Sequence, residues 1–382
     1  MHKKLMTVIF FLILFLIPII SLIMMSEEES VFSENENRYL AGFPRYTFDR
    51  IMEGEFTVGF ENWANDRVFG RINWIKFKNK IELTLGKTEI SGVFITDERM
   101  VQAWKDYDAK AVSKNLDAMN QFAERHDVPV YFMLAPTSQE IYRSTLPDGA
   151  PAGSQKDFIK YCYDYLSDIT PIDVLPVLDE NSERYIYYRT DHHWTSLGAY
   201  IAYSSAAPAM GFTPLDMGRF NIEHASSSFQ GTLYSKTLNS NITSDIIDIY
   251  TLSEGEPEVT VKVDGGNSND EYQSLYFREY IDAKDKYSTY LGIIAPVVEI
   301  KPVSGGSGKR LLIFKDSYAH CLIPFLAKNY SEITMVDMRN INMDYNGLVN
   351  ISDYDQVLFM YNVITFSEDR NLTKLNMGVK RY

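Results

Sequence analysis

The stretch Lys309-Arg310-Leu311-Leu312-Ile313-Phe314-Lys315-Asp316-Ser317-Tyr318-Ala319 decides the fold that this sequence predicts. The apolar run 311–314 is typical of a short buried strand, and residues 318–328 predict a helix directly after it. Ser317 stands at the turn between the two. A serine at such a turn is exposed, and its backbone N–H lies at the helix N-terminus, where negative charge is favoured. We therefore expect Ser317 to be a nucleophile, although a serine that only caps a helix would have the same local sequence.

Two more apolar runs downstream predict strands of the same sheet. Residues 332–338 form the first run, which ends at Arg339, and residues 356–361 form the second, which ends at Asn362. In a parallel α/β sheet, ligands gather at the carboxyl ends of the strands. We therefore expect Ser317, Arg339 and Asn362 on one edge of the sheet.

The chain before this unit alternates in the same way. Residues 109–125 and 157–166 predict helices, and residues 128–134 and 172–175 predict strands. This alternation indicates an α/β fold with a mainly parallel sheet between layers of helices. Residues from about 215 to 304 break the alternation and predict an irregular insertion that contains strands.

A second candidate site element is the segment Tyr187 to Thr195, which contains Asp191-His192-His193-Trp194. Only six histidines occur in the chain, so two beside an aspartate are unusual. A histidine in a Ser/His/Asp relay needs a carboxylate on its far nitrogen. In an extended segment Asp191 and His193 lie on one side, and His192 points to the other. Trp194 has two interpretations, a packed anchor for the loop and a platform for a sugar ring.

Two other interpretations concern the histidines and the aspartate. Asp191, His192 and His193 carry donor atoms that suit a metal, but no second cluster supplies further ligands, so we predict no metal site and no cofactor. Asp191 also suits a simple turn or cap. His320 follows Ser317 on the predicted helix and remains an alternative base.

The composition restricts the class of partner and the redox chemistry. The net charge of −14 argues against nucleic acid and against an anionic membrane surface as partners. The two cysteines, Cys162 and Cys321, form no metal pattern. We expect both thiols to be free and buried, with a disulfide as the alternative if the protein is exported.

The N-terminal region predicts an anchor followed by the folded part. Residues 5–25 are almost continuously apolar and follow two lysines in the segment 1–4, which favours an uncleaved transmembrane signal anchor with a cytoplasmic N-terminus. Residues 26–85 predict a linker and a helical region, with helices between 48 and 85. Residues 86–382 predict the main domain, outside the cytoplasm.

The Asp191-His192-His193-Trp194 signature resembles that of the bacterial DHHW family, which is similar to the SGNH-hydrolase-like domains of alginate O-acetylation proteins. Further stretches that carry the resemblance are Glu34–Arg38, Gly92–Ile95, Ala135–Thr137 and Phe229–Thr232. The resemblance implies an SGNH-hydrolase-like three-layer domain. In these relatives the aspartate and histidine of an Asp-x-His-Trp motif precede the serine, which implies Asp191, His193 and Ser317 as the catalytic residues.

The resemblance also implies roles for neighbouring residues, and it has one departure. Arg339 and Asn362 are implied as oxyanion or substrate contacts, and His192 as a structural or substrate-side residue. The Gly-Asp-Ser block of SGNH enzymes reads Lys315-Asp316-Ser317 here. Without that glycine, the form of the oxyanion hole is open.

The implied function is a membrane-anchored, extracytoplasmic O-acetyltransferase or acetylesterase that uses a Ser-His-Asp triad. Its expected substrate is a cell-surface or secreted polysaccharide or peptidoglycan, and a membrane-bound O-acyltransferase is the implied acetyl donor. A different class of function fits the altered Lys315-Asp316-Ser317 block: a glycan-binding or assembly protein that retains the fold without catalysis.

Overall fold

The structure is a computed structural model that describes residues 2–24, 31–264, 269–292, 295–302, 308–341 and 345–377. The chain divides into two compact units. Unit 1 comprises Met1–Ser91 with Tyr234–Asn241, and unit 2 comprises Gly92–Leu233 with Ile242–Tyr382. Part of the predicted linker, residues 26–30, and the last residues of the predicted insertion, 303–304, lie outside the described residues.

Unit 1 is mainly helical, as the sequence predicts for residues 48 to 85. Its elements are α1 His2–Met24, β1 Phe32–Ser33, β2 Arg38–Tyr39, α2 Phe48–Met52, α3 Glu55–Asp66, α4 Arg71–Thr84 and β3 Glu89–Ile90. Gly54 and Gly70 separate the last three helices, with φ values of 79° and 67°. Only glycine adopts this left-handed conformation without strain, so these two residues set the helix boundaries.

The predicted membrane anchor at residues 5–25 falls on α1, apart from Met25, which is not described. Among the described helices, none has the combined length and apolar character that a membrane crossing requires. This finding does not support the predicted anchor.

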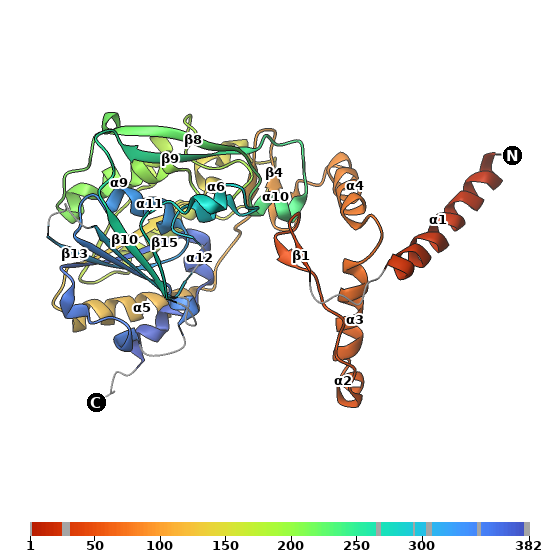
Figure 1. The fold of residues 1–382 in the computed structure, drawn as a ribbon, viewed down its shortest axis with the longest axis horizontal. Coiled ribbons are helices and arrows are strands. Elements are labelled where there is room, and N and C mark those ends of the chain that lie inside the picture. The colour runs from red at the N-terminus through yellow and green to blue at the C-terminus, as the bar shows by residue number, and fades with distance from the viewer. Residues whose placement is uncertain are drawn as a thin grey trace. The chain divides into compact units, whose positions relative to one another are not determined.

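Unit 2 is built on an eight-stranded sheet with the order β11-β10-β12-β14-β13-β15-β6-β7 (Figure 1). The strands are β6 Val130–Ala135, β7 Ile169–Pro171, β10 Val259–Asp264, β11 Asn269–Tyr272, β12 Val297–Pro302, β13 Arg310–Lys315, β14 Glu332–Val336 and β15 Gln356–Asn362. The run β14-β13-β15-β6-β7 is parallel, and β12, β10 and β11 continue it antiparallel. The predicted α/β class with a mainly parallel sheet is confirmed.

The predicted strand at 172–175 is wrong. β7 ends at Pro171, and Leu175 already begins the helix α8 Leu175–Glu180. The Asp173 carboxylate accepts a hydrogen bond from the Leu175 N–H at 3.0 Å, and Pro176 occupies the first turn. An aspartate before a helix and a proline in its first turn both favour a helix start over a strand.

Helices cover both faces of the sheet, because its central strands are apolar on both sides. In β6, Tyr131 and Met133 belong to one core, whereas Phe132 and Leu134 belong to the other. The first core includes residues of α6 Ser138–Ile141, α8, α9 Ser196–Met210 and α11 Tyr318–Leu326. The second includes residues of α5 Ala109–Arg125, α7 Gln155–Asp164 and α12 Val363–Glu368.

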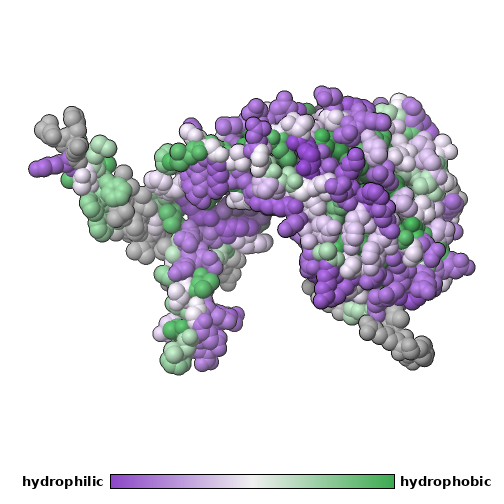
Figure 2. All heavy atoms as spheres, turned by 180° about the vertical axis from the view of Figure 1, so that it is seen from behind, coloured by the Kyte–Doolittle hydropathy of each residue, from purple (hydrophilic) through white to green (hydrophobic). Residues whose placement is uncertain are grey.

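The predicted insertion at about 215–304 contains strands, but it is not separate from the sheet. β8 Phe220–Phe229 and β9 Asp245–Leu252 form their own antiparallel pair, whereas β10, β11 and β12 extend the main sheet. The short helix α10 Thr232–Thr237 follows β8, and a small hairpin of β4 Val93–Ile95 and β5 Met100–Gln102 precedes α5. The face of unit 2 drawn in Figure 2 is mostly hydrophilic.

Candidate active site

The Asp191-His192-His193-Trp194 segment is the tip of a tight hairpin. Tyr187 and Trp194 form an antiparallel bridge, and the Tyr188 N–H donates to the His193 carbonyl at 3.2 Å. Thr195 caps the next helix, because its hydroxyl accepts from the Gly198 N–H at the start of α9. The hairpin is therefore fixed at its base by a bridge and a helix cap.

Asp245, the first residue of β9, holds the tip of this hairpin. Its carboxylate accepts hydrogen bonds from the Arg189 N–H at 2.7 Å and from the Thr190 N–H at 2.8 Å. The Thr190 hydroxyl donates to the same carboxylate. Asp245 is fully buried, and burial raises its pKa while these hydrogen bonds lower it. The satisfied carboxylate fixes the backbone just before Asp191.

Trp194 lies in the core beneath the hairpin. Its side chain is fully buried, and its indole N–H donates to the Tyr318 carbonyl at 3.1 Å. This position agrees with the packed-anchor interpretation. The contact also joins the hairpin to the first residue of α11, next to Ser317.

The Asp191 carboxylate is saturated with hydrogen bonds. One oxygen accepts from the backbone N–H of His193 at 3.0 Å and from its ring Nδ1 at 2.6 Å. The other accepts from the backbone N–H of Thr232 at 2.8 Å and from its hydroxyl at 3.0 Å. Burial raises the pKa of Asp191, but its electrostatic interactions with the imidazoles of His192 and His193 and these hydrogen bonds hold it well below its usual range. Asp191 is therefore ionised at neutral pH.

His193 connects this carboxylate to Ser317. Its Nε2 lies 2.7 Å from the Ser317 Oγ, and its Nδ1 lies 2.6 Å from Asp191. An ionised carboxylate only accepts, so Nδ1 must donate the proton and Nε2 of the neutral ring must accept from the serine hydroxyl. The structure thus brings together the three residues that the sequence analysis assigns to a relay.

Tyr287, in the 3₁₀ helix Lys286–Thr289, supports both members of the His193–Ser317 pair. Its ring stacks on the His193 imidazole with centroids 3.7 Å apart and an angle of 5° between the planes. Its hydroxyl donates to the Ser317 carbonyl at 3.0 Å. Tyr287 therefore fixes the plane of the imidazole and the backbone of the serine at once.

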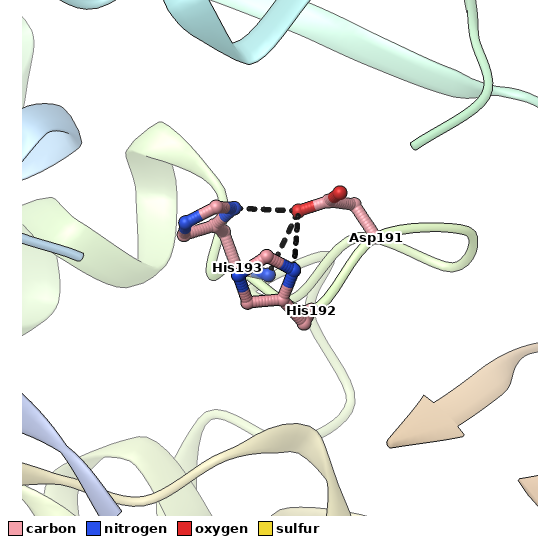
Figure 3. Close-up of side chains that lie close together, drawn as sticks. All are labelled: Asp191, His192 and His193. Carbon is pink, nitrogen blue, oxygen red and sulfur yellow. Dashed lines mark hydrogen bonds and ion pairs between the residues drawn. The ribbon is translucent and has the colours of Figure 1, made fainter. Parts of the chain in front are cut away.

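The prediction that His192 points to the side opposite His193 is wrong, because the centroids of the two rings lie 3.9 Å apart. The His192 Nδ1 lies 2.7 Å from the Thr232 hydroxyl and 3.7 Å from Asp191. Figure 3 shows Asp191 interacting with both imidazoles. Donor atoms of Asp191, His192 and His193 lie within 4.8 Å of one another, so these residues could hold a metal ion. An ion bound to Nδ1 of His193 would replace the Asp191–His193 hydrogen bond and leave the ring proton on Nε2, so that His193 could not accept from Ser317.

Ser317 lies directly before α11 and is half-buried, whereas the residues on either side of it are buried. Among the described residues, none accepts a hydrogen bond from the Ser317 backbone N–H. That N–H stands at the helix N-terminus, where a developing negative charge is favoured.

Asn362 is at the edge of the sheet that the sequence predicts, but its amide is occupied. Its Nδ2 donates to Asp316 at 2.6 Å and to the Thr365 hydroxyl at 2.8 Å. Its Oδ1 accepts from the Ile364 and Thr365 N–H groups and so caps α12. Asp316 also accepts from the Tyr318 N–H at 2.8 Å. In this arrangement Asn362 orients Asp316 and the turn that carries Ser317, with no amide hydrogen left for a substrate.

Arg339 lies at the carboxyl end of β14, in the 3₁₀ helix Met338–Asn340. Its guanidinium donates to Asp337 twice, at 2.9 and 2.6 Å, and its side chain remains 28% exposed. Burial raises the pKa of Asp316, and the Arg339 charge partly offsets that rise. Arg339 therefore acts on the turn electrostatically and keeps part of its side chain exposed.

Lys315 and His320 form a buried pair behind Ser317. The Lys315 Nζ lies 2.7 Å from His320 Nε2, and His320 Nδ1 lies 3.1 Å from the Tyr290 carbonyl. Because a carbonyl only accepts, Nδ1 carries the proton and Nε2 accepts from the ammonium. Burial and the Lys315 charge hold the pKa of His320 well below its usual range. Both ring nitrogens are engaged away from Ser317, which removes the geometric basis for His320 as the base.

Sequence reasoning missed three residues that hold this site: Asp245, Tyr287 and Thr232. Thr232 belongs to the stretch Phe229–Thr232 that carries the family resemblance, but the sequence predicts no contact between it and Asp191. None of the three stands in a recognisable pattern with the hairpin. All three come from the insertion, whose strand-containing but irregular sequence gave no signal beyond the family-like stretch 229–232.

Comparison with known proteins gives a family and a fold. The family model described as DHHW protein matches residues 109–336. No curated protein matches the chain. A DHHW family protein from Eubacterium siraeum is similar in structure, with a TM-score of 0.66 and 24% identity over 77% of this chain and 98% of that one. PatB1 of Bacillus cereus, solved with a sulfonyl adduct, has a TM-score of 0.62 and 20% identity over 74% of this chain and 97% of that one. The O-acetyltransferase domain of Pseudomonas putida AlgJ has a TM-score of 0.46 and 14% identity over 74% of this chain and 94% of that one.

At these identities the structural likeness to the first two proteins shows a shared fold. The family model, in contrast, covers more than half of the sequence and includes both the hairpin of Asp191 and His193 and the turn of Ser317. The chain therefore belongs to the DHHW family.

Proposed function

We propose that this chain transfers acetyl groups through a covalent intermediate on Ser317, with His193 as general base and Asp191 as its orienting carboxylate. The observation that carries the proposal is the continuous hydrogen-bond chain from Asp191 through His193 to Ser317, with heavy-atom distances of 2.6 and 2.7 Å. Both distances suit a nucleophile and its base, and an ionised Asp191 supports the tautomer that the reaction needs.

The proposed reaction has two balanced halves. His193 Nε2 takes the proton of the Ser317 hydroxyl while Oγ attacks the carbonyl carbon of an acetyl ester. The tetrahedral oxyanion collapses, the ester bond to the donor breaks, and the donor oxygen takes the proton from His193. A sugar hydroxyl then gives its proton to His193 and attacks the carbonyl carbon of acetyl-Ser317. The second tetrahedral oxyanion collapses, the bond between the acetyl group and the Ser317 Oγ breaks, and Oγ takes the proton from His193, which releases the acetylated sugar and restores the serine. Water in place of the sugar would make the reaction an ester hydrolysis.

The oxyanion needs a hydrogen-bond donor, and the Ser317 backbone N–H is the first candidate. Arg339 is the second, since its side chain is partly exposed and positively charged. One preorganised donor contributes about 3–4 kcal/mol to the stability of such a transition state. We propose no oxyanion role for the Asn362 amide, because its hydrogens are already donated.

The proposed acceptor is a polysaccharide outside the cytoplasm, and the proposed donor is a membrane-bound O-acyltransferase. Both follow from the resemblance of the Asp-x-His-Trp motif and its downstream serine to alginate O-acetylation proteins. The sulfonyl adduct on PatB1 of Bacillus cereus supports a test with the same class of reagent.

The test compares the wild type with Ser317→Ala and His193→Ala, and Ser113→Ala on α5 serves as a matched control away from the site. Wild type and Ser113→Ala should release nitrophenol from p-nitrophenyl acetate and gain one sulfonyl group from phenylmethanesulfonyl fluoride, located on Ser317 by mass spectrometry. The other two variants should do neither. Acetylated oligosaccharide in the products would identify transfer. Equal background rates and no labelling in all four proteins would reject catalysis and leave glycan binding as the function.

A further inference from the structure

A polar cavity of about 520 Å³ adjoins the base of the hairpin that carries Asp191 and His193. Four segments of unit 2 line it: the turn of the β4–β5 hairpin, the end of α6 with the residues after it, the segment after α8, and Arg189 of the hairpin itself. The volume is within the range of small-ligand sites. The proposed function uses none of these residues.

Two arginines converge on the floor of this cavity. The Met100 N–H donates to the Arg189 carbonyl at 2.8 Å, which brings Arg99 and Arg189 together from different segments. The Arg99 guanidinium lies 3.4 Å from the centroid of the Tyr142 ring, and that of Arg189 lies 4.5 Å from the centroid of the Tyr185 ring. Stacking on an aromatic face fixes the direction in which a guanidinium presents its donors.

The hydrogen-bonding groups of this floor are incomplete. Beyond their contact with each other, Arg99 Nη1 and the Tyr142 hydroxyl are both buried without a hydrogen-bond partner among the described residues, and Tyr142 is only 6% exposed. Neither Arg99 nor Arg189 forms an ion pair with a described carboxylate. Burial raises the pKa of the Tyr142 hydroxyl, with Arg99 and Arg189 partly offsetting the rise, so the hydroxyl is a donor at neutral pH. Buried donors without acceptors are costly, and an acceptor from a ligand would satisfy them.

The floor of the cavity and its rim carry different charges. Arg99 and Arg189 are half-buried on the floor, whereas Arg184 and the acidic residues Asp97, Glu98 and Glu183 are exposed at the rim. The floor is therefore positive even though the chain as a whole is acidic. Hydroxyl side chains also line the walls, namely those of Thr96, Ser144, Thr145 and Ser182.

We propose that this cavity binds a carboxylate-bearing sugar, with the carboxylate between Arg99, Arg189 and the Tyr142 hydroxyl and the ring hydroxyls against the walls. A free small anion would match only the floor, and a neutral sugar would match only the walls. The further statement that this sugar belongs to the acetyl acceptor rests on the proposed function. Arg189 supports it, because it stands two residues before Asp191 in the same hairpin.

The test measures binding by isothermal titration calorimetry to the full chain carrying Ser317→Ala, so the readout does not depend on turnover. The ligands are a uronic-acid tetrasaccharide, a neutral glucose tetrasaccharide, sodium acetate and sodium phosphate. We expect the uronic-acid ligand to bind, and to bind at least about ten-fold more weakly after Arg99→Gln or Arg189→Gln, since a charged hydrogen bond is lost. Tyr142→Phe should weaken binding in the same direction.

The control is Arg278→Gln, because Arg278 is an exposed arginine paired with Glu223 outside the cavity. This variant should bind as the parent does, and thermal unfolding of every variant checks its fold. Equal binding of charged and neutral tetrasaccharides, unchanged binding in all three floor variants, or phosphate or acetate binding as tightly as the uronic-acid ligand would each overturn the proposal. These outcomes are separate from a failed Ser317 reaction, which would leave the binding result standing.

Discussion

At the scale of single residues, the charge of Asp191 bears on which ring nitrogen of His193 carries the proton. Asp191→Asn keeps the shape of the side chain but replaces one carboxylate oxygen with an NH₂ group. One Asp191 oxygen already accepts from two donors, the backbone N–H and the hydroxyl of Thr232. The other oxygen also meets two donors, the backbone N–H and the Nδ1–H of His193, but the His193 ring can shift its proton. The amide should therefore turn its oxygen towards Thr232 and its NH₂ towards His193, which forces the proton onto Nε2 and leaves the His193 backbone N–H without this acceptor. Such a tautomer cannot accept from Ser317. We expect hydrolysis of p-nitrophenyl acetate to fall by about 10³–10⁴-fold, by analogy with other Ser/His/Asp sites.

Asp127→Asn is the matched control, because Asp127 is an exposed aspartate on the surface of unit 2. It should retain wild-type turnover. Urea unfolding at pH 7 separates a catalytic effect from a structural one. A fall of less than about ten-fold in Asp191→Asn, with the fold intact, would contradict the role of the carboxylate in holding the tautomer.

The buried Lys315 should make the free energy of unfolding depend on pH. Burial lowers its pKa from 10.5 to about 8, against the raising effect of Asp337. The unfolded state therefore binds a proton in this pH range that the folded state does not, and the stability from this group rises with pH between the two values. We expect the free energy of unfolding of wild type, relative to Lys315→Met, to increase from pH 8 to pH 10 in urea titrations. A difference that stays constant with pH would contradict a depressed pKa.

At the scale of elements, the close approach of the loop after β8 to the hairpin holds the proposed site together. A Cβ on Gly231 would lie 2.3 Å from an Asp191 oxygen and 2.4 Å from the Asp191 Cβ. Gly231→Ala should therefore push the loop away, break the Thr232 contacts to Asp191, and lower both stability and turnover by measurable amounts. Gly347→Ala is the control, since a Cβ there meets no atom within 4 Å. A melting temperature and a turnover rate equal to those of the wild type in Gly231→Ala would show that the loop shifts without loss of stability or activity.

The elements that sequence predicts well are those determined by their own residues. The apolar runs of β13 and β15 and the amphipathic α5 are visible because periodicity and burial agree within one segment. The hairpin residues Asp191 and His193 were also predictable, since their spacing already suits a relay. Tyr287 and Asp245 were not, because only tertiary packing brings them from the insertion to the hairpin. The sequence pattern around Tyr287 and Asp245 contains no information on their contact with the hairpin.

At the scale of the whole unit, the parallel centre of the sheet was predictable and its antiparallel edge was not. Alternating strands and helices require parallel pairing in one sheet, which the order β14-β13-β15-β6 bears out. β10, β11 and β12 have no such requirement, because short strands in an irregular segment can pair with each other or with an open edge. Their addition beside β14 depends on which edge is left unpaired, a property of the assembled sheet.

The same layered organisation determines how the two thiols behave, and both are free and buried, as the sequence predicts. Cys162 lies in one core and Cys321 in the other, so the sheet separates them and they cannot pair. Burial raises the pKa of both, that of Cys321 to about 12, so neither forms the reactive thiolate in the folded state.

We therefore expect the folded protein to give no fast reaction with Ellman's reagent, and two thiols to react in concentrated guanidinium chloride. Because both cores pack on one sheet, the two thiols should become reactive at the same denaturant concentration, coincident with the loss of circular dichroism. Cys162→Ala and Cys321→Ala assign the two signals. Exposure of Cys321 at a lower concentration than Cys162 would show that the layer carrying α11, and with it Ser317, opens before the opposite layer does.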